Sequence, residues 1–198
     1  VIFDSTGVKV YGEGEWKVRQ HGVSKRRTWR KLHIGANPED GEIQAVILTE
    51  NSVSDDAAVE VLLEQIEQEI DKFAADGAYD KRKVYDGLNA HSPGVKILIP
   101  PRNAKRARIW KHGNTKAERL KRDENLRSIR KHGRKEWKKN SGYHIRSLSE
   151  TAMFRLKTIF GDELSARLLE TQTTQALVRC AALNRMTHLG MPQSYKVA

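Results

Sequence analysis

The chain has 198 residues, of which 36 are Lys or Arg and 25 are Asp or Glu, so its formal net charge at pH 7 is +11. This length is enough for one substantial domain with its own core, whereas two unrelated domains would be crowded. No apolar run approaches the roughly 20 residues that span a bilayer, the N-terminus lacks the pattern of a secretory signal, and the single Cys180 excludes an internal disulfide, so we expect a soluble protein in a reducing compartment.

The N-terminal residues predict an antiparallel meander of three strands. The run VIFDST predicts a first strand that ends near Asp4. The stretches TWRKLHIGA (28–36) and GEIQAVILTE (41–50) predict the second and third strands, and the turn NPEDG joins them. The first part of the chain is therefore expected to form a sheet.

Helices and strands then alternate. Ser54 and the acids after it predict the N-terminus of an amphipathic helix over 55–70. The run KFAAD (72–76) predicts a fourth strand. A short helix is expected over 81–90, and a fifth strand over 95–100, where two prolines stop it.

The character of the chain changes after these prolines. Residues 101–141 are basic and contain few large apolar side chains, which indicates a mainly helical insertion. From Tyr143 onward we expect two helices, broken near Gly161, and then a loose tail over 189–198. This order predicts an α/β fold in which a mixed five-stranded sheet is covered by helices on both faces.

Positive charge is concentrated in two segments. From Arg102 to Lys139 there are sixteen Lys and Arg against four Asp and Glu, and from Lys17 to Lys31 there are seven basic residues and no acid. In contrast, residues 55–71 contain seven acids and no Lys or Arg. Such segregation favours basic surfaces for a polyanion such as DNA or RNA, the alternative being a charged face that only maintains solubility.

One stripe of polar side chains is predicted on a helix that begins at Tyr143. At about 100° per residue, four side chains share an arc of about 60° and form a row roughly 21 Å long: Tyr143, Arg146, Glu150 and Lys157. The opposite face is apolar and is expected to pack on the sheet through Ile145, Leu148, Ala152, Leu156 and Ile159.

The residue types in this stripe suit a nucleic-acid strand. Arg146 and Lys157 can pair with phosphates, and Tyr143 can hydrogen-bond or stack. Glu150 would repel a phosphate unless a divalent cation of the Mg²⁺ kind lies between their oxygens. Two other interpretations remain open from the helix alone: a capping box from Ser147 to Glu150, and an ordinary exposed i,i+4 arrangement.

Two further acids favour the metal. Asp4 and Asp76 each follow a short apolar run, where a buried strand can present a carboxylate at the end of the sheet. A single aspartate at such a position is usually a turn former. Two of them, together with Glu150 on a core-packed helix and a basic insertion, make a coincidence less plausible.

These residues resemble the DDE transposases of bacterial insertion sequences, in the branch marked by the motif Y-x2-R-x3-E-x6-K. The four residues of the stripe match this motif without a gap. The similarity extends to DST around Asp4, to RTWRKLHIG, to TENSVSDD and to ADGAYD around Asp76, and so covers nearly the whole chain.

The resemblance implies an RNase H-like catalytic domain over 1–188, with 101–141 as its insertion. It implies that Asp4, Asp76 and Glu150 are catalytic and hold two Mg²⁺ or Mn²⁺ ions that serve an in-line phosphoryl displacement. Water first frees a 3′-OH at the end of the element, and this 3′-OH then attacks target DNA. The expected partners are element ends, target DNA and a second copy of the chain, in the bacterial cytoplasm at the nucleoid.

DNA contacts are expected from several other positions. The resemblance assigns the Tyr, Arg and Lys of the motif to DNA near the cleaved end. Trp110 and Trp137 in the insertion could stack on an unpaired base or could anchor the insertion on the core. Arg106 and Arg108 are further candidates for binding DNA.

Three residues outside the motif receive simpler interpretations. His33 is expected to be a packed strand residue rather than a metal ligand. Asp55 and Asp56 are expected to be acids at a helix N-terminus, with a supporting role near the metals left open.

Two expectations concern what this chain does not include or does not do. It begins VIFDST with no initiator Met, and nothing in it corresponds to the N-terminal helical region with which relatives recognise element ends, so we expect a catalytic core. The alternatives to a transposase are an RNase H-like nuclease without strand transfer and an inactive remnant that still binds DNA.

Overall fold

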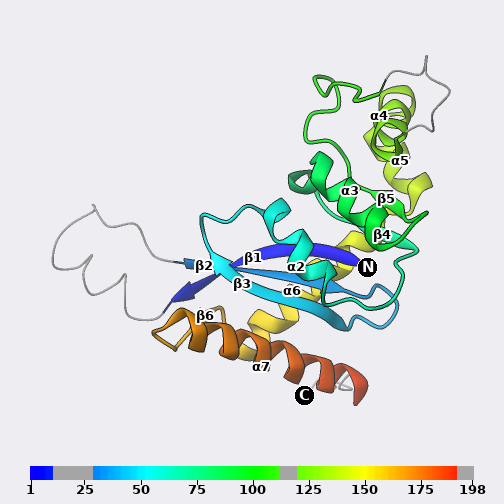
Figure 1. Ribbon diagram of the computed structural model, residues 1–198. Helices are drawn as coiled ribbons and strands as arrows, with labels where there is room; N and C mark the ends of the chain where they lie inside the picture. The colour runs from blue at the N-terminus through cyan, green and yellow to red at the C-terminus, as the bar shows by residue number, and fades with distance from the viewer. Residues whose placement is uncertain (11–28, 112–119, 191–198) are drawn as a thin grey trace, which may run out of the picture.

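The computed structural model describes residues 1–10, 29–111 and 120–190 (Figure 1). Part of the basic segment 17–31, part of the insertion and most of the expected tail lie outside these residues. One sheet with the strand order β3-β2-β1-β4-β5 organises the fold, and a sixth strand also pairs with β1. Its strands are β1 Ile2–Val10, β2 Trp29–Ala36, β3 Ile43–Glu50, β4 Lys72–Ala74, β5 Lys96–Leu98 and β6 Glu163–Leu164.

Strand directions in this sheet confirm the predicted fold class. The first three strands form the expected antiparallel meander, whereas β4 and β5 run parallel to β1. With β1 at the centre and helices on both faces, this is an RNase H-like sheet. The strand β6 was not predicted. It pairs with the far end of β1, at Lys9 and Val10, because β4 pairs with β1 only at Ile2 and leaves that edge open.

The predicted end of the first strand was wrong. Strand β1 continues to Val10 because β2 pairs with it along its length, from the pair Ile2 and Ala36 to the pair Lys9 and Trp29. Asp4 therefore lies within a strand, on the open edge of β1 between the positions where β4 and β6 pair with it.

Helices cover the two faces in separate layers (Figure 1). On one face, α2 and α3 close a core that contains Phe3, Phe73 and Ile97. On the other face, α6 and α7 pack against the meander. The bounds are α2 Val59–Leu63, α3 Arg82–His91, α6 Ser147–Phe160 and α7 Leu169–His188. No helix among the described residues is long and apolar enough to cross a membrane.

The insertion extends the second layer over β4 and β5. Its helices are α4 Lys121–His132 and α5 Arg134–Ser141, and the short helix η3 Tyr143–Arg146 follows them. A third core cluster joins Ile129, Trp137 and Tyr143 from these elements to Ile2 and Leu98 of the sheet. Although it is rich in charge, the insertion is thus packed on the sheet and lies beside the edge that carries Asp4.

Two predicted helices are shorter than expected. The helix over 55–70 is replaced by η1 Asp55–Ala57 and α2, and Ser54 makes no side-chain cap. After α2 ends, side chains at the end of α3 form hydrogen bonds with the backbone of residues 66–70 in place of helical ones. A His91 ring nitrogen lies 2.7 Å from the Ile66 carbonyl oxygen, and Ser92 Oγ accepts from Ile70 N at 2.8 Å. The helix expected from Tyr143 begins only at Ser147.

Candidate active site

Strand register brings the two predicted aspartates to the same level of the sheet. Ile2 pairs with Ala74 in parallel, and each aspartate lies two residues further along its own chain. Strand β4 ends at Ala74, where the chain turns into η2 Gly77–Tyr79. The Asp76 carboxylate caps this turn by accepting from Ala78 N at 2.7 Å.

The Asp4 carboxylate is largely enclosed, with 14% of the side chain exposed. It accepts from Ser5 N at 2.9 Å and from Ser149 Oγ at 3.0 Å, and Arg146 Nη2 lies 3.3 Å from Oδ2. Burial raises the pKa of Asp4, with a small contribution from the charge of Asp76, although Arg146 and the two serines act in the opposite direction. A positive charge at this position is therefore stabilised.

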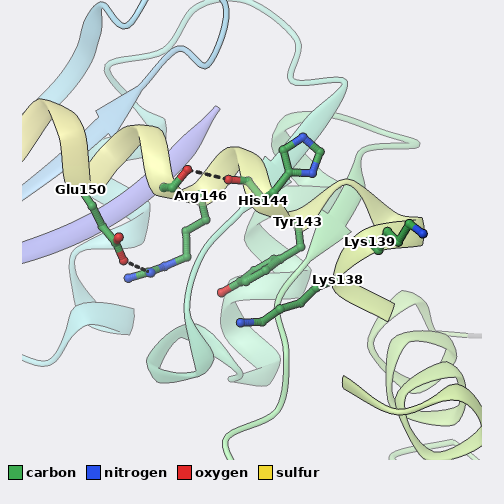
Figure 2. A pocket seen from close by; sticks show the side chains of 7 residues that line it. Lys138, Lys139, Tyr143, His144, Arg146 and Glu150 are labelled. Atoms are coloured by element: carbon green, nitrogen blue, oxygen red, sulfur yellow. Dashed lines mark hydrogen bonds and ion pairs between the residues drawn. The ribbon is translucent and has the colours of Figure 1, made fainter. Parts of the chain in front are cut away.

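Arg146 joins the first and third predicted carboxylates. One end of its guanidinium contacts Asp4. The other end contacts Glu150 in the first turn of α6, as Figure 2 shows. Glu150 is the more exposed acid, with 59% of its side chain accessible. Two carboxylates thus converge on one cation. Among the described residues, no three His, Cys, Asp or Glu side chains lie close enough to hold a metal ion between them.

Lys157 lies further along the same edge. Its Nζ donates to Thr6 Oγ1 at 2.6 Å, two residues beyond Asp4 on β1. Since alternate residues of a strand share one face, Thr6 and Asp4 face α6 together. The lysine and arginine of the motif therefore follow the open edge of β1.

The phase of α6 differs from the expected one. The side chains that it buries are Ser149, Ala152, Met153 and Leu156, whereas Leu148 and Ile159 are 40% and 42% exposed. The predicted apolar face was therefore wrong: the buried face of α6 is rotated from it by part of a turn. This rotation places Glu150 at the margin of the buried face, beside β1, rather than opposite it. Ser149, which sequence reasoning missed, reaches Asp4 for the same reason.

Tyr143 is part of the core rather than of an exposed stripe. It is 6% exposed, and its hydroxyl donates to the Ala75 carbonyl at 3.2 Å. Burial raises the pKa of Tyr143 to about 12. Tyr143 thus fastens η3 to the end of β4, next to Asp76, and it also lines the cleft beside Glu150, so its contact with DNA stays a prediction.

Both tryptophans of the insertion make anchoring contacts. Trp137 is 3% exposed, packs against Tyr143, and donates through Nε1 to Asn125 Oδ1 at 3.3 Å. The Trp110 ring lies 4.4 Å from the guanidinium of Arg122 and 5.4 Å from the ring of Tyr85. Of the two roles left open for Trp137, these contacts favour the anchor. In contrast, Arg106 and Arg108 are exposed.

A second polar network lies on the opposite face of β1. Asp55 accepts from Ser5 Oγ and from Lys31 Nζ, each at 2.7 Å. Burial acts to raise the pKa of Asp55, but these two partners hold it below the usual value. His33 is fully buried, and burial lowers its pKa to about 4, which fits the packed strand residue that was expected. Asp55 thus supports the strand that carries Asp4.

A cleft of about 580 Å³ opens beside Glu150 and Arg146 (Figure 2). Basic side chains from α5 and η3 line it, namely Lys138, Lys139 and His144. A carboxylate edge next to a basic cleft suits an anionic substrate such as a phosphodiester.

Comparison with known families identifies the class of protein that this fold and site define. Residues 1–185 match the family described as the transposase DDE domain. The chain belongs to this family. No solved structure gives a significant match to the chain.

Proposed function

We propose that this transposase domain cleaves DNA at the ends of an insertion sequence and joins the freed ends to target DNA. Asp4, Asp76 and Glu150 are its catalytic acids and its metal ligands. The observation that carries this proposal is the position of Arg146, whose guanidinium joins Asp4 to Glu150 on the edge where Asp76 lies level with Asp4.

The chemistry of the donor set, rather than its present spacing, suits two divalent ions of the Mg²⁺ or Mn²⁺ kind. Every side chain in question offers carboxylate oxygens, which hard cations prefer. The Arg146 guanidinium contacts both Asp4 and Glu150, so it takes the place that a metal cation between these two acids would have. When bound, such ions activate the attacking oxygen and stabilise the leaving one.

The other residues orient the acids and the substrate. Ser5 N and Ser149 Oγ fix the Asp4 carboxylate, and Ala78 N fixes that of Asp76. Lys157, half-buried beside Thr6, is positioned to neutralise a phosphate on the open edge of β1. Arg146 can exchange its carboxylates for a phosphate when the acids take up metal, as bidentate pairing to phosphate suits a guanidinium.

The proposal extends to domain organisation and partners. The catalytic domain covers 1–188 with 101–141 as its insertion, and two copies act together on paired element ends. Joining is separated from simple cleavage by its products, because strand transfer yields branched or joined DNA molecules whereas a nuclease yields only cut ones.

The direct test is an assay on DNA from the region that flanks the coding sequence, searched for inverted repeats. Wild type is compared with Asp4→Asn, Asp76→Asn and Glu150→Gln in Mg²⁺ or Mn²⁺. Each substitution keeps the shape and removes the charge, so cleavage should fall by several orders of magnitude. Glu170→Gln, at an exposed position of α7, is the matched control and should cleave normally. Equal cleavage by all proteins would refute the proposal.

A further inference from the structure

A second cleft, of about 600 Å³, opens on the far side of the Asp76 turn from α6. We call it the η2 cleft. It is bounded by η1, by Gly77 and Ala78 of η2, by residues 80–81, and by the loop 101–107 that leaves β5. One cleft therefore ends at Glu150, and the other begins at the turn that Asp76 caps.

The cations of the η2 cleft outnumber the acids with which they can pair. Five Lys and Arg side chains line it, against three aspartates. Each aspartate has a cationic partner: Asp55 has Lys31 at 2.7 Å, Asp56 has Lys83 at 2.8 Å, and Asp80 has Arg122 at 3.0 Å.

Three cations of the η2 cleft have no side-chain partner among the described residues, namely Lys81, Arg102 and Arg106. All three are exposed. Three unpaired positive charges on one hollow surface form a site for an anion that carries several charges.

The loop that carries two of these cations is firmly held. Arg130 of α4 donates to the Ala104 carbonyl at 3.0 Å and also to that of Ala107, and Arg134 reaches the Pro101 carbonyl at 3.4 Å. Gly77 allows the loop to approach closely, since a Cβ there would lie 2.9 Å from both Arg102 Cγ and the Pro100 carbonyl oxygen. The backbone that carries Arg102 and Arg106 is thus fixed before any ligand arrives.

We infer that the η2 cleft binds the phosphate backbone of the DNA strand on the side of the reacting phosphate opposite to the segment held along α6. This inference rests on the proposed function. A strand whose reacting phosphate lies at the carboxylates has one arm directed toward each cleft. The unpaired guanidinium and ammonium groups bind phosphates of this arm without reading sequence, so the η2 cleft contributes affinity rather than specificity.

The first experiment measures the binding of a fluorescent duplex of arbitrary sequence at several salt concentrations. The triple variant K81A/R102A/R106A is compared with K96A/R167A/R185A, which removes the same charge from exposed positions outside both clefts. Each lost phosphate contact reduces the slope of log K against log salt by about 0.9. The cleft variant should lose about 2 to 3 in slope and, in 0.1 M salt, on the order of 10²-fold in affinity.

The second experiment reads proximity directly and does not depend on the triple variant being stable. The native Cys180 is 2% exposed, so a cysteine introduced at Arg102 would be the accessible thiol among the described residues. DNA that carries an activated disulfide on a tether at one backbone phosphate should undergo thiol–disulfide exchange with R102C, which joins the protein sulfur to the tether sulfur and releases the activating thiol. Lys96→Cys, at the start of β5, is the control and should not react.

These outcomes separate the cleft from the catalytic proposal. Equal salt slopes for the two triple variants, or equal cross-linking at positions 102 and 96, would overturn the cleft inference while the carboxylate variants still test the chemistry. A second outcome would support DNA binding in the η2 cleft and refute the proposed function. In it, the cleft variant has the smaller salt slope and cross-links form at position 102 but not at 96, while the carboxylate variants cleave like wild type.

Discussion

Replacing Arg146 with Gln should tighten divalent-metal binding in the absence of DNA. The Arg146 guanidinium neutralises the two carboxylates that a metal would bind, since it lies 3.3 Å from Asp4 and also contacts Glu150. A metal that enters between these acids must first displace Arg146. Without this competitor, the two carboxylates face the metal unpaired.

The size of the effect follows from how exposed each contact is. Arg146 and Asp4 are 22% and 14% exposed, and a hydrogen bond between charged groups of this kind contributes about 1.5–3 kcal/mol before solvent screening. Glu150 is 59% exposed, so its i,i+4 pair adds only about 0.3–0.5 kcal/mol. Discounted for exposure, the competition amounts to about 1–2 kcal/mol, or roughly a 5- to 30-fold change in affinity.

Calorimetric titration with Mn²⁺ measures this change directly. Arg155→Gln removes the same charge from α6, the helix that follows Arg146, and should bind Mn²⁺ like wild type. Asp4→Asn combined with Arg146→Gln should lose the gain, because the ligand is then missing. If Arg146→Gln binds Mn²⁺ no more tightly than Arg155→Gln, the guanidinium does not occupy the metal position and the reasoning fails.

Three further predictions concern stability. Burial lowers the pKa of His33 in the folded chain to about 4 from its ordinary value of 6.5, so the unfolded chain binds the extra proton, and the free energy of unfolding should fall by up to about 3 kcal/mol as pH drops from 6.5 to 4. In urea unfolding, the stability of His33→Gln should depend less on pH. Arg122→Met leaves Asp80 without its bidentate partner and should cost about 3 kcal/mol in urea unfolding. Tyr143→Phe removes the hydrogen bond to Ala75 and should lower unfolding free energy by about 1 kcal/mol.

Each of these three predictions has a control or an outcome that would contradict it. Arg108→Met, in the same insertion, should leave the urea midpoint unchanged, whereas an equal loss in both variants would mean that charge rather than the Asp80 pair is responsible. A pH profile of His33→Gln that follows wild type would show that another group binds the proton. If Tyr143→Phe unfolds like wild type, its hydroxyl is not needed to hold η3.

Much of the sheet could be predicted because its signals are local. Apolar runs bounded by turn residues located the central strands, and the prolines after β5 marked its end. The end of β1 could not be predicted, because polar residues after Asp4 resemble a turn while their strand character depends on pairing with β2. The two-residue strand β6 exists only because an edge of β1 is free, which no local pattern records.

In the candidate site, too, the features set by local sequence were predictable and those set by distant contacts were not. Spacing correctly grouped Arg146, Glu150 and Lys157 on one side of a helix, since that depends on helical geometry alone. It misplaced Tyr143, because the helix begins four residues later and the tyrosine lies in a tighter turn against the sheet. Its polar hydroxyl suggested an exposed role, but the Ala75 carbonyl satisfies it inside the core.

What the spacing could not indicate is that Arg146 and Glu150 are partners before DNA arrives. Both residue types suit a surface that binds phosphate and metal, and each was therefore assigned its own ligand. Asp4, brought from another part of the chain to within 3.3 Å, makes the difference, because its enclosed carboxylate needs a cation whether or not metal is present. A residue expected to hold DNA thus also balances the charge of these acids. Since DNA and metal both compete with this pairing, each should favour the binding of the other.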